Sequence, residues 1–104
     1  MAKPKRARTV RREAARRLTE LGRDRERLFL REPGGTPEHP IPVDSSSVVE
    51  SRARSVPCPR CDGEHRVEEH RAVSTPSGLL REARLVCSRC GSRRSLWFRL
   101  PLPN

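Results

Sequence analysis

The strongest constraint on this chain is the spacing of its four cysteines. They form two Cys-x-x-Cys pairs, Cys58–Cys61 and Cys87–Cys90, with 25 residues between the pairs, and the sequence has no other cysteine. Each pair spans a short turn that can direct two sulfur atoms at one point. Together the pairs offer the four thiolates of a closed tetrahedral site. The spacing therefore predicts one structural zinc ion bound by Cys58, Cys61, Cys87 and Cys90.

The size and composition of the chain favour a metal over a large hydrophobic core. The chain has 104 residues, of which 33% are hydrophobic and 3% are aromatic. This length allows one small domain with tails. The segment from Val56 to Asn104 is under fifty residues long, and natural domains of that size usually need a metal or disulfides.

A disulfide framework is the alternative use of four cysteines. The first residues are basic and contain no hydrophobic stretch of the kind found in signal peptides. No segment approaches the roughly 20 apolar residues of a membrane span. These features predict a reducing, cytoplasmic environment without membrane association, in which metal binding is favoured over disulfides.

The residues around the cysteines suit tight metal-binding turns. Gly91 and Asp62 each follow the second cysteine of a pair, and both residue types tolerate the left-handed backbone region. Arg60 and Arg89 are third in their turns, where they are expected either to offset the charge of the metal centre or to stay solvated. His65 is a further candidate ligand, but it is disfavoured because four thiolates already complete the shell.

The first third of the chain is predicted to be a basic helix preceded by a tail. Residues 1–8 are basic and cannot bury an apolar surface, which predicts a disordered tail. Residues 9–31 are predicted to form a basic amphipathic helix, because their apolar residues recur at helical spacing. These residues are Ala14, Leu18, Leu21 and Leu28. The stripe is narrow, so the helix is expected to be marginal without a partner.

Residues 32–47 are predicted to be a linker of Pro, Gly and Ser residues that ends the helix. The folded domain is predicted over residues 48–104. The β-branched residues of 48–54 predict a leading strand at its start. Three further strands are predicted over residues 65–74, 79–87 and 93–100. In the first of these, Val67 and Val73 are expected on one face because an even number of positions separates them.

The segment Cys58-Pro-Arg-Cys-Asp-Gly, followed by a strand hairpin and then Cys87-Ser-Arg-Cys-Gly, resembles the zinc ribbon group of domains. The resemblance covers about residues 56–100, nearly half of the chain. It implies a three-stranded antiparallel sheet that two metal-binding knuckles clamp at one end, with the four cysteines as ligands. Zinc ribbons recur in transcription factors, RNA polymerase subunits and ribosomal proteins, and their fold implies no single function.

The net charge of +10 is concentrated in the N-terminal arm. Residues 1–31 contain twelve Lys and Arg residues against four Asp and Glu residues, a net charge of +8. Such a polarised basic chain predicts a polyanionic partner, most simply DNA or RNA. The predicted contacts are Lys3, Lys5, Arg6, Arg8, Arg11, Arg12, Arg16 and Arg17 in the arm and Arg93, Arg94 and Trp97 in the domain.

These features favour two classes of function and disfavour a third. The first is a nucleic-acid-associated zinc ribbon that acts in transcription, translation or chromosome structure. The second is an adaptor that docks on a protein complex of the transcription or translation machinery, with the helix as its partner-binding or dimerisation element. The third is an enzyme. It is disfavoured because four cysteines close the zinc shell and no catalytic motif occurs, so no small-molecule substrate is expected.

Overall fold

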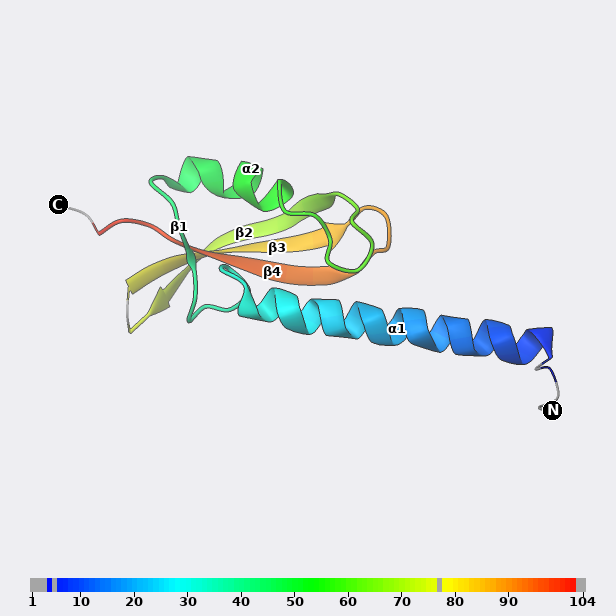
Figure 1. Ribbon diagram of the computed structural model, residues 1–104. Coiled ribbons are helices and arrows are strands. Elements are labelled where there is room, and N and C mark those ends of the chain that lie inside the picture. The colour runs from blue at the N-terminus through cyan, green and yellow to red at the C-terminus, as the bar shows by residue number, and fades with distance from the viewer. Residues whose placement is uncertain (1–3, 5, 77, 103–104) are drawn as a thin grey trace.

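The computed structural model describes residue 4, residues 6–76 and residues 78–102 of the chain. The molecule is elongated, with extents of 73 × 24 × 16 Å, and a long helix projects from one end of a small sheet (Figure 1). Its elements are helix α1 (Ala7–Arg31), strand β1 (Ile41–Pro42), the 3-10 turn η1 (Ser46–Val48), helix α2 (Val49–Arg54) and strands β2 (His65–Thr75), β3 (Gly78–Cys87) and β4 (Arg93–Arg99).

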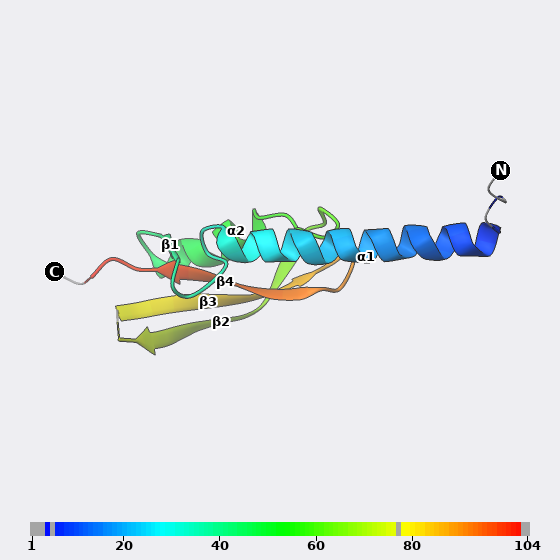
Figure 2. The same cartoon turned by 60° about the horizontal axis from the view of Figure 1, so that its bottom comes forward.

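Helix α1 confirms the predicted basic helix and begins at Ala7, two residues before the predicted start. It ends where Glu32 becomes extended ahead of Pro33. Only Gly22 and Phe29 of this helix are buried. Its N-terminal half therefore extends into solvent beyond the sheet (Figures 1 and 2). Among the described residues, no helix is long and apolar enough to cross a membrane.

The tail predicted over residues 1–8 is only partly described. Residues 1–3 and 5 lie outside the described residues, and residues 7 and 8 belong to α1. Helix α1 starts at Ala7, earlier than predicted, because alanine and arginine are among the best helix formers.

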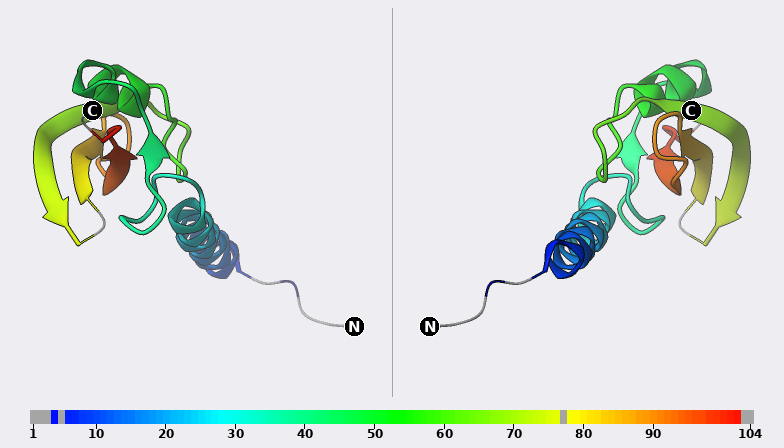
Figure 3. Two further views of the ribbon diagram at one scale, coloured as in Figure 1. Left: turned by 90° about the vertical axis from the view of Figure 1, so that its left-hand side faces the viewer. Right: turned by 90° about the vertical axis from the view of Figure 1, so that its right-hand side faces the viewer.

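The sheet has four strands in the order β1-β4-β3-β2 (Figure 3). Strands β2, β3 and β4 form the antiparallel meander that the sequence predicts. The prediction of three strands is wrong because the linker adds a fourth: Ile41 and Pro42 pair in parallel with Phe98 and Arg99 of β4. Proline is tolerated there because β1 lies at the edge of the sheet. The next residue, Val43, donates its N–H to the carbonyl of Arg99 over 3.0 Å.

The prediction of a leading strand over residues 48–54 is also wrong, because this segment is helical. The Oγ of Ser45 caps η1 by accepting a hydrogen bond from the N–H of Ser47 at 3.2 Å. In α2, Val49 and Ala53 are four residues apart on one face of the helix, and both are fully buried. Adjacent valines favour a strand locally, but burial of this helical face against β2 and β3 outweighs that preference.

The hydrophobic core lies on the face of the sheet that carries α2 and the C-terminal end of α1 (Figure 2). Its buried residues are Phe29, Val49, Ala53, Ala83, Leu85, Leu96 and Phe98. The alternation of β4 places Leu96 and Phe98 in this core and leaves Trp97 half-buried on the opposite face.

A β-bulge in β2 reverses the alternation along that strand. The bulge lies between Val67 and Glu69, so the pairing passes from Val67 opposite Leu85 to Val73 opposite Leu80. Val67 therefore packs against the core, whereas Val73 lies on the other face. The prediction that these two valines share a face is wrong, because the inserted residue changes the parity of the strand.

The opposite face of the sheet has a polar centre. Glu82 is only 5% exposed there and accepts hydrogen bonds of 2.6 Å from both Arg71 Nε and Ser95 Oγ. Burial alone would raise the pKa of the Glu82 carboxyl, but the hydrogen bonds from Ser95 and Arg71 and the charge of Arg84 lower it. Arg71 and Arg84 of this face thus both pair with the buried Glu82.

Two glycine-to-alanine substitutions are expected to change stability in opposite directions. Gly34 has a φ of +87°, and a Cβ there would lie 2.7 Å from Ile41 Cδ1 and 2.9 Å from Leu96 Cδ2. Gly34→Ala is expected to lower the free energy of unfolding by about 1–3 kcal/mol. Gly22 lies within α1, and a Cβ there would meet only Arg60, at 3.6 Å or more.

Gly22→Ala is therefore expected to raise the stability by up to about 1 kcal/mol, the helix preference of alanine over glycine. Denaturant titrations followed by circular dichroism measure both changes. Equal losses of stability in the two variants would contradict the described surroundings of both glycines.

Candidate metal centre

The four cysteines meet at one end of the sheet. Cys58 and Cys61 lie in the loop before β2, Cys87 ends β3, and Cys90 lies in the turn before β4. The four Sγ atoms all lie within 4.8 Å of one another, with Cys58 and Cys90 3.7 Å apart and Cys61 and Cys87 3.4 Å apart. A tetrahedral centre with metal–sulfur bonds of about 2.3 Å places its sulfurs about 3.8 Å apart. The cluster therefore fits a single metal ion.

The two turns have the same backbone hydrogen bonds, so the chain builds the same knuckle twice. The carbonyl of the first cysteine in each pair accepts the N–H four positions later, from Asp62 (2.8 Å) or Gly91 (2.9 Å). Its own N–H donates to the carbonyl five positions later, that of Gly63 or Ser92, each at 2.9 Å. Asp62 has a φ of 60° and Gly91 a φ of 75°, which confirms that both adopt the predicted left-handed region.

The backbone approaches the sulfur atoms closely on two sides. A Cβ at Gly63 would lie 2.9 Å from the Sγ of Cys87 and 3.1 Å from that of Cys61, so glycine is needed at this position. The Sγ of Cys87 also accepts the backbone N–H groups of Arg89 at 3.4 Å and Cys90 at 3.5 Å. Such donors stabilise a thiolate over a thiol.

The sulfurs affect one another's protonation. Burial alone would raise the pKa of the Cys58 thiol, but hydrogen bonds from Ser92 and from backbone N–H groups of its own turn lower that pKa to about 6. Burial and the hydrogen bond to Cys87 raise the pKa of Cys61 to about 12. Four neighbouring thiolates repel one another. A cation at their centre is therefore needed for all four to be ionised together.

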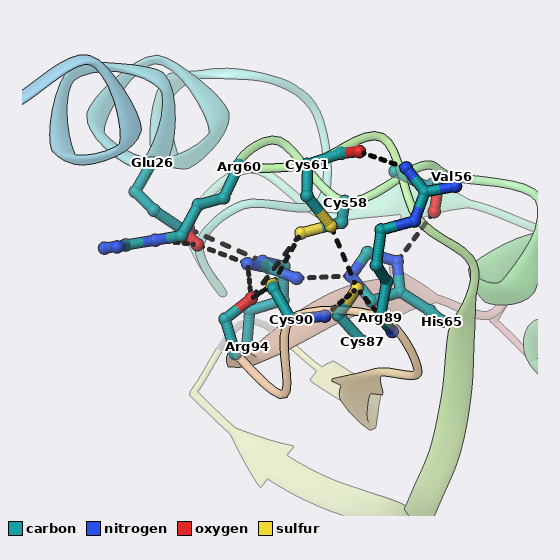
Figure 4. A network of polar contacts seen from close by, with 11 residues as sticks. Glu26, Val56, Cys58, Arg60, Cys61, His65, Cys87, Arg89, Cys90 and Arg94 are labelled. Atoms are coloured by element: carbon teal, nitrogen blue, oxygen red, sulfur yellow. Dashed lines mark hydrogen bonds and ion pairs between the residues drawn. The ribbon is translucent and has the colours of Figure 1, made fainter. Parts of the chain in front are cut away.

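The two arginines inside the knuckles bind different acceptors. Arg89 reaches the other knuckle, where its Nη1 donates to the carbonyl of Cys61 at 3.0 Å. Arg60 turns towards α1, where its Nε donates to Oε1 of Glu26 at 3.1 Å. One arginine thus ties the knuckles to each other, and the other ties the first knuckle to the helix (Figure 4).

Arg94 belongs to the surroundings of the metal centre. Its side chain is only 4% exposed, and it forms an ion pair with Glu26 and hydrogen bonds to His65 Nε2 and, at 2.7 Å, to Ser92 Oγ. The Ser92 Oγ in turn lies 3.0 Å from the Sγ of Cys90. This burial removes Arg94 from the predicted nucleic-acid contacts, because the alternation of β4 directs it to the covered face of the sheet. The sequence offers no local signal for this role, since Glu26 is 68 residues away.

His65 supports the site and is not one of the four clustered ligands. It is 2% exposed, and its Nδ1 lies 2.7 Å from the carbonyl oxygen of Val56, an acceptor. Because a carbonyl oxygen can only accept, the matching tautomer of His65 carries its proton on Nδ1 and leaves Nε2 to accept a hydrogen bond from Arg94. Both ring nitrogens are thus engaged away from the sulfurs, in agreement with the preference for four thiolates.

The other predicted nucleic-acid contacts fall into three groups. Lys3 and Lys5 lie outside the described residues. The arginines of the arm are exposed on α1 or directly before it: Arg6, Arg8, Arg11, Arg12, Arg16 and Arg17. In the sheet, Arg93 is exposed but donates its Nε to Glu68 at 2.8 Å, and Trp97 is half-buried.

Replacing one ligand is expected to unfold the domain. Cys87→Ser removes a thiolate from the metal centre, and metal binding supplies about 10–16 kcal/mol in comparable peptides at neutral pH. The variant is therefore expected to lose its bound metal and the dispersion of the hairpin's NMR signals. The neighbouring Ser88→Ala leaves all four thiolates in place and serves as the control. A Cys87→Ser chain that stays folded in excess chelator would contradict the metal centre.

Comparisons with protein-family models, with curated proteins and with solved structures give no match to this chain. The description of the site therefore rests on its own geometry: four cysteines in two equivalent knuckles, placed to bind one metal ion.

Proposed function

We propose that this chain is a zinc-ribbon protein without catalytic activity that binds nucleic acid through the basic helix α1. Four thiolates in tetrahedral reach of one point favour zinc among the common metals. The antiparallel meander with matching knuckles at one end supports the zinc-ribbon assignment. A closed shell of four cysteines leaves no open coordination position for a substrate, which favours a structural role for the metal.

The free, arginine-rich half of α1 is the observation that carries the nucleic-acid part of the proposal. This half projects past the knuckles, away from the sheet (Figure 1). At 100° per residue, Arg8, Arg12 and Arg16 lie on one side of the helix, and all three are exposed. Exposed guanidinium groups in a row suit the phosphates of a nucleic-acid backbone.

The sheet is a poorer candidate surface because three of its exposed arginines already form ion pairs. Arg71 pairs with the buried Glu82, Arg84 with Glu69, and Arg93 with Glu68. Trp97 is the chain's single tryptophan and is half-buried, so it offers no extended platform for stacking bases. The proposed mode of binding is therefore sequence-independent contact between α1 and the phosphates. We further propose that the protein is cytoplasmic and works in transcription, translation or chromosome structure.

The test is the salt dependence of binding. The chain and the triple variant Arg8→Gln/Arg12→Gln/Arg16→Gln are titrated with duplex DNA, duplex RNA and single strands at several salt concentrations. Each lost phosphate contact is expected to reduce the slope of log K against log salt by about one. With duplex DNA, the slope of the triple variant should therefore be shallower by about three than that of the unmodified chain.

The matched control is the triple variant Arg52→Gln/Arg54→Gln/Arg66→Gln, which removes the same charge from exposed positions of the folded domain. It is expected to retain the slope of the unmodified chain. The proposal fails if the unmodified chain binds no nucleic acid at low salt, or if both triple variants lose the same slope.

Exposed leucines on α1 favour a second candidate function, a protein-interaction adaptor. Leu18, Leu21 and Leu28 are 70%, 45% and 58% exposed, and their helical spacing places them on the side opposite the arginine row. Leu18→Gln/Leu21→Gln should abolish capture of a protein partner, or self-association measured by light scattering, without changing nucleic-acid affinity. That outcome would favour the adaptor.

A further inference from the structure

We propose that Glu26 anchors α1 to the metal centre, so that metal binding and docking of the helix stabilise each other. Glu26 would then be a positioning residue that sets the direction of the basic arm. The coupling rests on the metal centre, and its consequence for binding rests on the proposed role of α1.

Glu26 connects the helix to the first knuckle and to the start of β4, directly after the second knuckle. Its side chain is 20% exposed, and its carboxylate accepts hydrogen bonds from Arg60 at 3.1 Å and from Arg94. Arg60 lies between Cys58 and Cys61, inside the first knuckle. Burial alone would raise the pKa of the Glu26 carboxyl, but its contacts with Arg94 and Arg60 lower it, so Glu26 is ionised in the folded chain.

Arg94 extends the connection to the sulfurs of both pairs. It donates to the Oγ of Ser92, which lies 3.5 Å from the Sγ of Cys58 and 3.0 Å from that of Cys90. The Arg94 guanidinium also lies over the Phe29 ring, 5.8 Å from its centroid. Negative sulfurs, a buried cation and the Glu26 carboxylate thus follow one another from the metal centre to the helix (Figure 4).

The helix contacts the domain through one narrow side. Gly22, Glu26 and Phe29 recur at steps of four and three and share that side. Phe29 enters the core, Glu26 binds the two arginines, and Gly22 faces the Arg60 side chain. Residues 7–21 of α1 are exposed apart from the half-buried Glu13. These three contacts therefore set the direction in which the arm points.

The coupling has a physical cause in each direction. Metal binding fixes the first knuckle, which places Arg60 at the helix. In return, the Glu26 carboxylate neutralises Arg94, a cation that is costly to bury without a partner. If Glu26 is lost, the turn that carries Ser92 and Cys90 loses that support. Linkage requires that the helix strengthen metal binding by the same factor by which the metal strengthens helix docking.

The experiment compares Glu26→Gln with Glu20→Gln in the zinc-loaded full chain. Both substitutions remove one negative charge from α1, but Glu20 is exposed. Zinc affinity is measured by competition with a chromophoric chelator, and hydrogen exchange is measured over residues 22–31. Mutation of a residue that orients metal ligands typically lowers the affinity for the metal by about 10–100-fold. Glu26→Gln should weaken zinc binding at least about tenfold and accelerate exchange, whereas Glu20→Gln should change neither.

Equal zinc affinities in the two variants would overturn the coupling, even if exchange accelerates in Glu26→Gln. If Glu26→Gln does not fold, Arg60→Gln tests the same coupling, since it removes one donor and leaves Arg94 paired with Glu26. Arg60→Gln should weaken zinc binding and loosen the helix together, and a change in only one of them would overturn the proposal. Neither readout uses DNA or RNA, so a chain that binds no nucleic acid would defeat the proposed function without affecting this test.

Discussion

The convergence of four cysteine sulfurs on one point is the constraint on which the rest of the structure depends. The pairing of β2 with β3 starts at His65 opposite Cys87, and the pairing of β3 with β4 ends at Val86 opposite Arg93. The knuckles therefore clamp the same end of both hairpins. In a domain with so small a core, a metal ion bound by the four sulfurs is expected to supply stability that burial of apolar surface cannot.

The position of α1 follows from that clamp. The turn after the helix is fixed to β4, because the N–H of Trp97 donates to the carbonyl of Gly34 at 2.9 Å. Phe29 joins the core, and Glu26 binds Arg60 of the first knuckle and Arg94 of β4. Most of the remaining length of α1 is solvent-exposed and rich in arginine, and this is the part of the chain to which nucleic-acid binding is proposed.

The sequence predicted features that depend on local spacing and missed those that depend on distant partners. Local sequence predicts the cysteine pairs, the left-handed residues after them and the three meander strands, because neighbouring residues determine these features. Strand β1 exists only because β4 offers it an edge, and α2 is helical because Val49 and Ala53 are buried together on the sheet. No spacing rule reveals the bulge in β2 or the pairing of Arg94 with Glu26.

The most direct test of the metal centre is X-ray absorption at the zinc edge of the purified chain. Four sulfur neighbours at about 2.3 Å around one zinc ion are expected, because the closed cluster leaves no place for lighter ligands. A first shell containing nitrogen or oxygen would contradict the four-thiolate centre, as would a folded chain that carries no metal.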